Sequence, residues 1–214
     1  MEKNIFSKIY MWVFIGLLIT FASGYYLATS IPLINLIFGT SLYWVIFIAQ
    51  IIIAIVLPVR LMKMSKTTAT ILYLLYTLLT GLTFTSIFIM FEITSIIFVF
   101  LVTAVVFLVF ALIGRFTKID ITKIGTFLVM GLIGIIILEI INVFVMSSGL
   151  DMFLCIIGLV LFLGYTAYDI QKIKKMDDYG MDKDKLAIIG AFDLYLDFIN
   201  LFLRLLRLFG KGRD

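Results

Sequence analysis

A stripe of polar residues runs through the last long apolar segment of the chain. Its members recur at steps of four, three, four and three residues: Asp193, Asp197, Asn200, Arg204 and Arg207. In an α-helix this spacing places all of them on one face. Acidic side chains at membrane depth are costly and normally face a protein interior or a water-filled cavity. The stripe therefore predicts a functional face on a membrane-embedded helix.

The composition is that of a polytopic membrane protein. The chain has 214 residues, of which 64% are hydrophobic and 14% charged, whereas soluble domains have about 25% charged residues. Runs of about 20 apolar residues are long enough to span a bilayer. We expect one all-α domain, residues 1–214, with seven transmembrane helices. The predicted spans are residues 10–28, 33–57, 69–90, 93–114, 124–146, 152–170 and 186–209.

Histidine is absent from the chain. This excludes Ser-His-Asp hydrolysis and zinc sites built on histidine. Proton chemistry near neutral pH must therefore use carboxylates. The single cysteine, Cys155, provides no disulfide framework. We expect no enzymatic activity and no tightly bound cofactor. We also expect no nucleic-acid partner, because the net charge of +4 is explained by basic residues that flank the membrane.

The basic residues predict an orientation. The N-terminus and the links after the second, fourth and sixth predicted helices hold 13 lysines and arginines, and the alternate links hold none. The positive-inside rule places the N-terminus in the cytoplasm. Membrane lipids are the expected surroundings, and the short loops favour a bacterial plasma membrane. Charge alone favours a re-entrant last segment, but its length suffices for a crossing, and we favour the crossing.

Three acidic residues are expected to approach one another from the cytoplasmic side. Asp169 closes the sixth predicted helix, and Asp193 and Asp197 lie about 10 Å and about 16 Å into the last one. Carboxylates held close together share a proton, so that such a pair changes its protonation near neutral pH. The protonated pair would be a hydrogen-bonded latch, and the ionised pair would attract a divalent cation. The alternative is that Asp193 and Asp197 pair with Arg204 or Arg60 and only hold helices together.

Two further residues are assigned by their depth in the membrane. Arg60 ends the second predicted helix and is the natural counter-ion for Asp169 or Asp197, although arginines there often extend to the lipid headgroups. Glu139, in the fifth predicted helix, either forms a hydrogen bond across helices or lines the outer half of an ion route.

The rest of the polar stripe divides into two parts. Asn200 is a candidate for the ion path. Arg204 and Arg207 are expected to extend to the membrane surface and only anchor the helix.

Two stretches of the chain resemble the Bax inhibitor-1 family. They are GYTAYDIQ, which ends in Gln171, and DLYLDFINLF at residues 193–202, followed by Arg204. The resemblance covers essentially the whole chain and is most specific in the last fifty residues. It implies a central last helix surrounded by the other six and a pH-sensitive calcium leak. In that comparison Asp169 and Asp197 are the pH sensor, Asp193 is a second acid, and Arg60 is a basic residue that exchanges partners.

Our leading hypothesis is a calcium leak channel gated by protonation of Asp169 and Asp197. Calcium ions and protons would be the transported and regulating ions, with Asp169 and Asp197 as transient calcium ligands. A proton-coupled cation carrier is the main alternative. An intramembrane aspartyl protease is less favoured, because the Gly-x-Gly-Asp signature is missing at Asp197. An interaction scaffold without transport is a further alternative, and its protein partners are not evident from the sequence.

Overall fold

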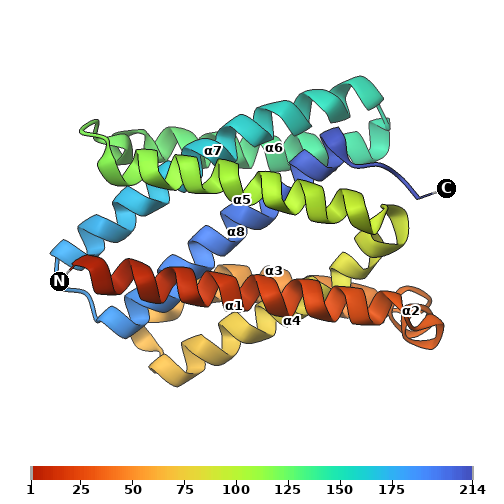
Figure 1. Ribbon diagram of the computed structural model, residues 1–214, viewed down its shortest axis with the longest axis horizontal. Helices are drawn as coiled ribbons and strands as arrows, with labels where there is room; N and C mark the ends of the chain where they lie inside the picture. The colour runs from red at the N-terminus through yellow and green to blue at the C-terminus, as the bar shows by residue number, and fades with distance from the viewer. Residues whose placement is uncertain (1, 214) are drawn as a thin grey trace. The chain divides into compact units, whose positions relative to one another are not determined.

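The computed structural model describes residues 2–213, and most of them are helical (Figure 1). The helices are α1 (Glu2–Ala28), α2 (Ile31–Phe38), α3 (Leu42–Arg60), α4 (Lys66–Met90), α5 (Ile93–Phe116), α6 (Gly125–Val145), α7 (Ser148–Asp178) and α8 (Lys183–Phe209), with short 3₁₀ turns at Leu61–Lys63 and Ile121–Ile124. Within this range, seven helices are long and apolar enough to cross a membrane, and only α2 is too short. The prediction of an all-α protein with seven spans is confirmed.

The predicted span 33–57 is wrong in one respect, because two helices replace it. α2 has only eight residues and ends at Gly39, whose amide donates to the Asn35 carbonyl at 2.9 Å. The Thr40 hydroxyl donates to the Leu36 carbonyl at 2.6 Å and satisfies another carbonyl at the helix end. The short polar break between α2 and α3 is hidden when hydropathy is averaged over a long window.

The polar stretch 171–185 lies between the sixth and seventh predicted spans, where its alternating charge suggests a solvated loop, but it is mostly helical. α7 continues to Asp178, and α8 begins at Lys183. Acidic and basic residues three or four positions apart support a helix, so alternating charge did not require a loop here. The helix ends where Gly180 adopts a left-handed conformation with φ of 75° and donates its amide to the Asp177 carbonyl at 3.0 Å.

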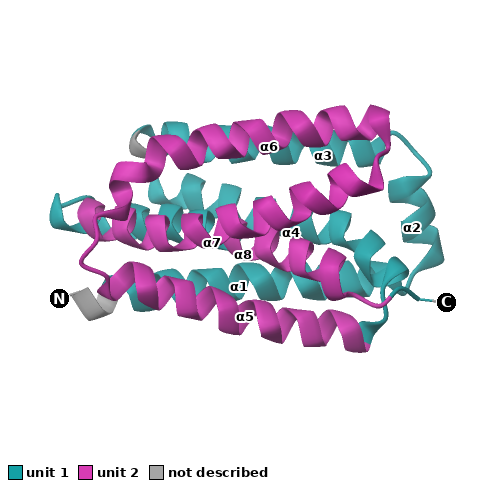
Figure 2. Cartoon of the chain, turned by 90° about the horizontal axis from the view of Figure 1, so that it is seen from above, with its two compact units in different colours: residues 1–93, 177–195, 212–214 teal, residues 94–176, 196–211 magenta. Residues whose placement is uncertain are grey.

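The chain divides into two compact units (Figure 2). Unit 1 consists of residues 1–93, 177–195 and 212–214, and unit 2 consists of residues 94–176 and 196–211. The first half of α8 thus belongs to unit 1 and the second half to unit 2. Each unit is described separately below.

In unit 1, α1 and α4 pack closely and run parallel. Gly16 lies against Tyr73, and two turns later Gly24 lies against the backbone of Gly81. The Tyr73 hydroxyl donates to the Trp12 carbonyl at 2.7 Å and fixes the register of the two helices. Small residues at such positions allow helix backbones in a membrane to approach closely.

The first half of α8 runs in the same direction as α1. Near its start, Asp184 pairs with Lys8 at 3.4 Å and with Lys66 at 2.7 Å. Further along, Tyr195 forms a 2.6 Å hydrogen bond with Thr20 of α1. α8 is one uninterrupted helix of 27 residues, and it has no internal turn of the kind that a re-entrant segment needs. The structure therefore favours a full crossing.

A buried hydroxyl joins three helices of unit 1, and its removal gives a testable prediction. Thr20 is fully buried, donates to the Thr77 carbonyl at 2.8 Å and bonds the Tyr195 hydroxyl. We expect Thr20→Val to lower the free energy of unfolding by about 1–2 kcal/mol, because two buried hydrogen bonds are lost. An unfolding titration in mixed detergent micelles measures this change.

Thr103 provides the matched control. It is equally buried, but its hydroxyl bonds only the Val99 carbonyl of its own helix at 2.7 Å. Thr103→Val should therefore change the stability by less than about 0.5 kcal/mol, because that carbonyl keeps its helical partner. Equal effects of the two substitutions would contradict an interhelical role for Thr20.

In unit 2, α6 and α7 form an antiparallel pair joined by a two-residue link. Gly125 lies against Tyr168 and Gly131 against Leu161, so the contacts advance in opposite directions along the two helices. α5 approaches α7 where Gly114 meets the backbone of Ala167.

The second half of α8 packs against α5 through aromatic rings. Phe198 lies 5.6 Å from Phe107, and Phe202 lies 6.4 Å from Phe100, between ring centroids. α8 is also the most buried of the candidate spans: 78% of its apolar window is buried, against 11–39% for the others. The polar stripe predicted from the sequence thus lies on the helix that is best shielded from the surroundings.

Candidate functional site

Two carboxylates are buried in unit 2. Asp169, from α7, is 6% exposed, and Asp197, from α8, is 3% exposed. Among the residues that the structure describes, these are the only charged side chains with so little exposure. A buried carboxylate is costly unless it is paired, hydrogen-bonded or protonated. The environment of these two acids is therefore the part of the molecule most sensitive to protons.

Tyr165 and Lys172 belong to the surroundings of these acids. The Tyr165 hydroxyl lies within electrostatic range of Asp169, Asp197 and Lys172. The Lys172 ammonium lies 3.6 Å from the Asp169 carboxylate, and its side chain is 36% exposed. Tyr165, Asp169 and Lys172 share one face of α7, because they are separated by four and three residues. The sequence reasoning did not assign a role to Tyr165.

The other predicted members of the sensor lie in unit 1. Asp193 is half-buried and sits one helical turn before Asp197 on α8. Arg60 is exposed at the end of α3. The tuning role of Asp193 and the counter-ion role of Arg60 stay predictions.

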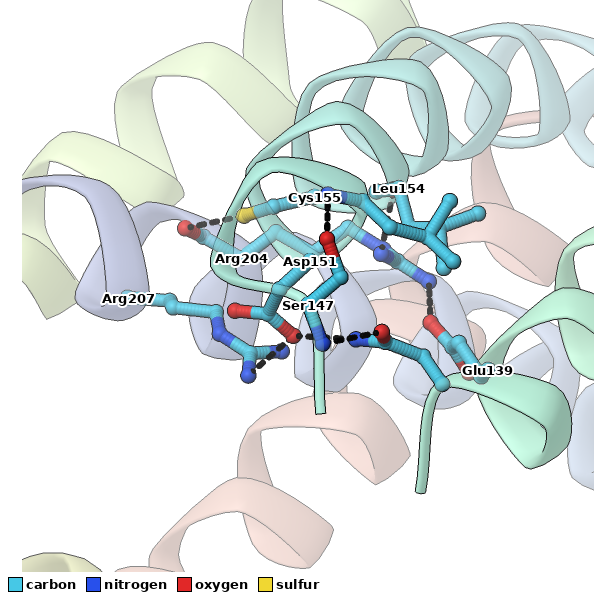
Figure 3. Close-up of polar contacts among 9 residues, drawn as sticks. Glu139, Ser147, Asp151, Leu154, Cys155, Arg204 and Arg207 are labelled. Atoms are coloured by element: carbon cyan, nitrogen blue, oxygen red, sulfur yellow. Dashed lines mark hydrogen bonds and ion pairs between the residues drawn. The ribbon is translucent and has the colours of Figure 1, made fainter. Parts of the chain in front are cut away.

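A second polar site in unit 2 is a pocket of about 510 Å³. Glu139 and Asn200, both predicted for the ion path, line it. Asp151 also lines this pocket, and the sequence reasoning missed it. Its carboxylate pairs with Arg207 at 2.5 Å and accepts a hydrogen bond from the Asn142 amide at 3.5 Å. Figure 3 shows this cluster between the start of α7, the end of α6 and the last turns of α8.

The expectation that Arg204 extends to the membrane surface is wrong. Its side chain is only 11% exposed, and its guanidinium pairs with Glu139 at 3.0 Å (Figure 3). The guanidinium also donates to the Leu154 carbonyl at 3.0 Å and lies 5.4 Å from the centroid of the Phe162 ring. These partners come from α6 and α7, and they surround the guanidinium, although its buried Nε atom has no hydrogen-bond partner. Glu139 therefore forms an interhelical pair and also lines the pocket.

Gly158 makes room for the Arg204 guanidinium. A Cβ atom added at Gly158 would lie 2.1 Å from the central guanidinium carbon and 2.4 Å from Nε. No side chain can occupy this position without moving Arg204. The sequence alone did not single out Gly158, because glycines in membrane helices commonly serve only close helix packing.

Comparison with known proteins identifies the family. The family model described as inhibitor of apoptosis-promoting Bax1 matches residues 2–214. The chain belongs to the Bax inhibitor-1 family. The inner membrane protein YbhL of Escherichia coli K12 is 41% identical over 213 residues, which is 97% of this chain and 91% of YbhL. A protein of Borreliella burgdorferi is 42% identical over 218 residues, covering 99% of this chain and 94% of its own.

A third relative in Rickettsia prowazekii is 38% identical over 213 residues, covering 97% of this chain and 89% of its own. This Bax inhibitor-1 family member is thus an integral, multi-pass membrane protein, as the hydropathy predicted.

In this Bax inhibitor-1 protein, Gln171 fixes the link between α5 and α6 beside Asp169. Its side-chain amide donates to the Ile119 carbonyl at 2.8 Å, and its oxygen accepts from the Ile121 amide at 2.9 Å. One turn further along α7, Lys175 pairs with Asp120 at 2.9 Å. Gln171 belonged to the motif that carried the family resemblance, but its contact could not be inferred from the motif.

Asp120 is an acid near this region that does not change its charge near neutral pH. Hydrogen bonds from Thr122 and then from Lys175 hold the pKa of the Asp120 carboxyl below its usual value. A lowered pKa means that the stabilising contact is present above the ordinary pKa and is lost only as the pH falls through the lower, folded-state value. Asp120 therefore stays ionised throughout the neutral range.

The residues that the structure describes contain no group of three or more acidic or cysteine side chains placed to hold a metal ion.

Proposed function

We propose that this Bax inhibitor-1 family protein is a pH-sensitive calcium leak channel of a bacterial plasma membrane, with its N-terminus in the cytoplasm. The observation that supports the proposal best is the burial of Asp169 and Asp197 in unit 2, on two different helices, with both acids within electrostatic range of Tyr165. An acid that is buried inside a membrane protein indicates a route for ions or protons.

The proposed gate uses one proton shared between the two carboxylates. With the proton bound, a hydrogen bond between Asp169 and Asp197 holds α7 and α8 together. When the proton leaves, the two negative charges repel each other and attract a divalent cation. Lys172, whose ammonium lies 3.6 Å from the Asp169 carboxylate and whose side chain is 36% exposed, is then a counter-charge that can move away. Arg60 and Asp193 are proposed as a further counter-ion and a tuning acid.

Calcium flux in proteoliposomes tests this proposal. The purified full-length protein should dissipate a calcium gradient, with a faster flux at about pH 8 than at about pH 6, because the open state is the deprotonated one. Flux equal to that of empty liposomes would contradict any transport role and favour an interaction scaffold. Saturable flux that is coupled to proton movement in the opposite direction would favour a carrier over a channel. Cleavage of a membrane peptide that depends on both acids would instead indicate a protease.

A further inference from the structure

The pocket and the buried acids occupy opposite ends of α7. Asp151 lines the pocket in the first turn of α7, and Asp169 lies 18 residues later. At 1.5 Å per residue this separation is roughly 27 Å along the helix, close to the thickness of the hydrocarbon core. The pocket therefore cannot be part of the proton-sensing site and needs its own explanation.

The charges in the pocket balance one another. Glu139 and Asp151 carry two negative charges, and Arg204 and Arg207 carry two positive ones in direct contact with them. The two arginines differ in their exposure. The Arg204 side chain is 11% exposed, whereas that of Arg207 is 58% exposed. Since water and salt screen exposed pairs, the charge of Arg204 has the larger effect inside the pocket.

Arg204 is held by its surroundings and not only by its ion partner. The guanidinium donates a hydrogen bond to the Leu154 carbonyl, lies near the Phe162 ring and occupies the space beside Gly158. The pocket also offers amide oxygens from Asn142 and Asn200, which suit a hard cation as carboxylates do. The Asn142 oxygen already accepts a hydrogen bond from the Ser147 amide at 3.1 Å. A mobile cation that approaches these oxygen atoms would meet the fixed positive charge of Arg204.

We propose that this pocket is a second station on the cation route, where Arg204 determines which ions enter. The Arg204 guanidinium occupies the Glu139 carboxylate, and a small mobile cation such as calcium enters by displacing it from that carboxylate. The inference rests on the proposed channel function and adds a charge-selective site to it. The competing interpretation is that the Arg204–Glu139 pair only holds α6 and α8 together.

A thiol placed on the pocket wall separates these two interpretations. Leu203 lines the pocket and is 37% exposed. Leu203→Cys in a Cys155→Ala background gives the full chain one reporter thiol, because Cys155 is the only native cysteine. The rates of modification by a cationic and by an anionic methanethiosulfonate reagent of similar size are measured in proteoliposomes. Their ratio reports the electrostatic potential in the pocket.

We expect Arg204→Gln to raise the cation-to-anion ratio about tenfold, because Glu139 then acts without its counter-charge. Glu139→Gln should lower the ratio by a similar factor. The double substitution should return the ratio close to its starting value, because it restores the charge balance. It also leaves no lone charge in the protein interior, so it tests the proposal even if a single variant folds poorly.

Arg207→Gln is the matched control. It removes the same charge from an arginine that is 58% exposed, against 11% for Arg204, so the ratio should change less than about threefold. The proposal is overturned if Arg204→Gln leaves the ratio unchanged. It is also overturned if Arg204→Gln accelerates both reagents equally, since that result indicates loosened helices and no charge selection.

Calcium flux distinguishes this proposal from the channel function on which it rests. Arg204→Gln should increase the flux several-fold while retaining its pH dependence. If wild-type protein shows no flux, the channel function fails, but the labelling ratios still report whether Arg204 controls the charge of the pocket.

Discussion

Replacing Asp169 or Asp197 with asparagine is expected to abolish the pH dependence of calcium flux. Asparagine keeps the size and hydrogen-bonding capacity of the side chain but cannot bind the shared proton. A single proton equilibrium changes the population of the open state by up to about tenfold per pH unit. We therefore expect wild-type flux to change roughly tenfold or more between about pH 6 and pH 8, and flux through either variant to change less than about twofold. Proteoliposome measurements at matched protein density test this.

Asp120→Asn is the control for this result. Asp120 lies in the same unit and contacts α7 through Lys175, but its pKa is held below the usual value, so it stays ionised over the whole range. Its replacement should leave the shape of the pH profile unchanged. If calcium flux keeps its wild-type pH dependence in both Asp169→Asn and Asp197→Asn, the proposed gate is contradicted.

The second large effect is expected at Gly114, where α5 meets α7. A Cβ atom there would lie 2.4 Å from the Ala167 carbonyl oxygen and 2.7 Å from its Cα. Both atoms are backbone, so no side-chain rotation can relieve the clash, and the helices must separate. We expect Gly114→Ala to lower the free energy of unfolding by about 1–3 kcal/mol, the usual cost of overpacking. Because Ala167 is two residues from Asp169, the substitution should also alter flux.

Gly134→Ala is the matched control, since Gly134 lies in the neighbouring helix α6 and a Cβ there would meet no atom within 4 Å. Alanine favours a helix over glycine by about 0.5–1 kcal/mol, so this variant should be as stable as the wild type or slightly more stable. A titration with sodium dodecyl sulfate in mixed micelles compares the two. Similar losses in both variants would show that the α5–α7 contact is not tightly packed.

The sequence was sufficient to predict features that depend on local pattern. Long apolar runs indicated the seven spans, and the steps of three and four residues placed Asp197 and Arg204 on one helix face. These predictions succeed because helical periodicity and membrane thickness constrain a single segment without reference to its neighbours. The depth argument also predicts that Asp169 and Asp197 approach one another. Both are buried in unit 2, and their pairing stays a prediction.

The partner of Arg204 could not be predicted in the same way. Its contacts with Glu139 and Leu154 depend on the rotation of α6 and α7 about their own axes, and side-chain packing between helices determines that rotation. An arginine near a helix end looks the same in the sequence whether its side chain extends to the membrane surface or pairs with an acid inside the protein. The break between α2 and α3 was missed for a different reason, since a few polar residues barely change an average over a long window.

The central claim is that Asp169 and Asp197 share a proton that they release near neutral pH. Infrared difference spectroscopy of the reconstituted protein tests it directly, because a protonated carboxyl group has a C=O stretch that an ionised one lacks. We predict a protonated-carboxyl band that appears on going from about pH 8 to about pH 6 and disappears from this range in both Asp169→Asn and Asp197→Asn. A wild-type spectrum without that band, or an undiminished band in both variants, would contradict the account.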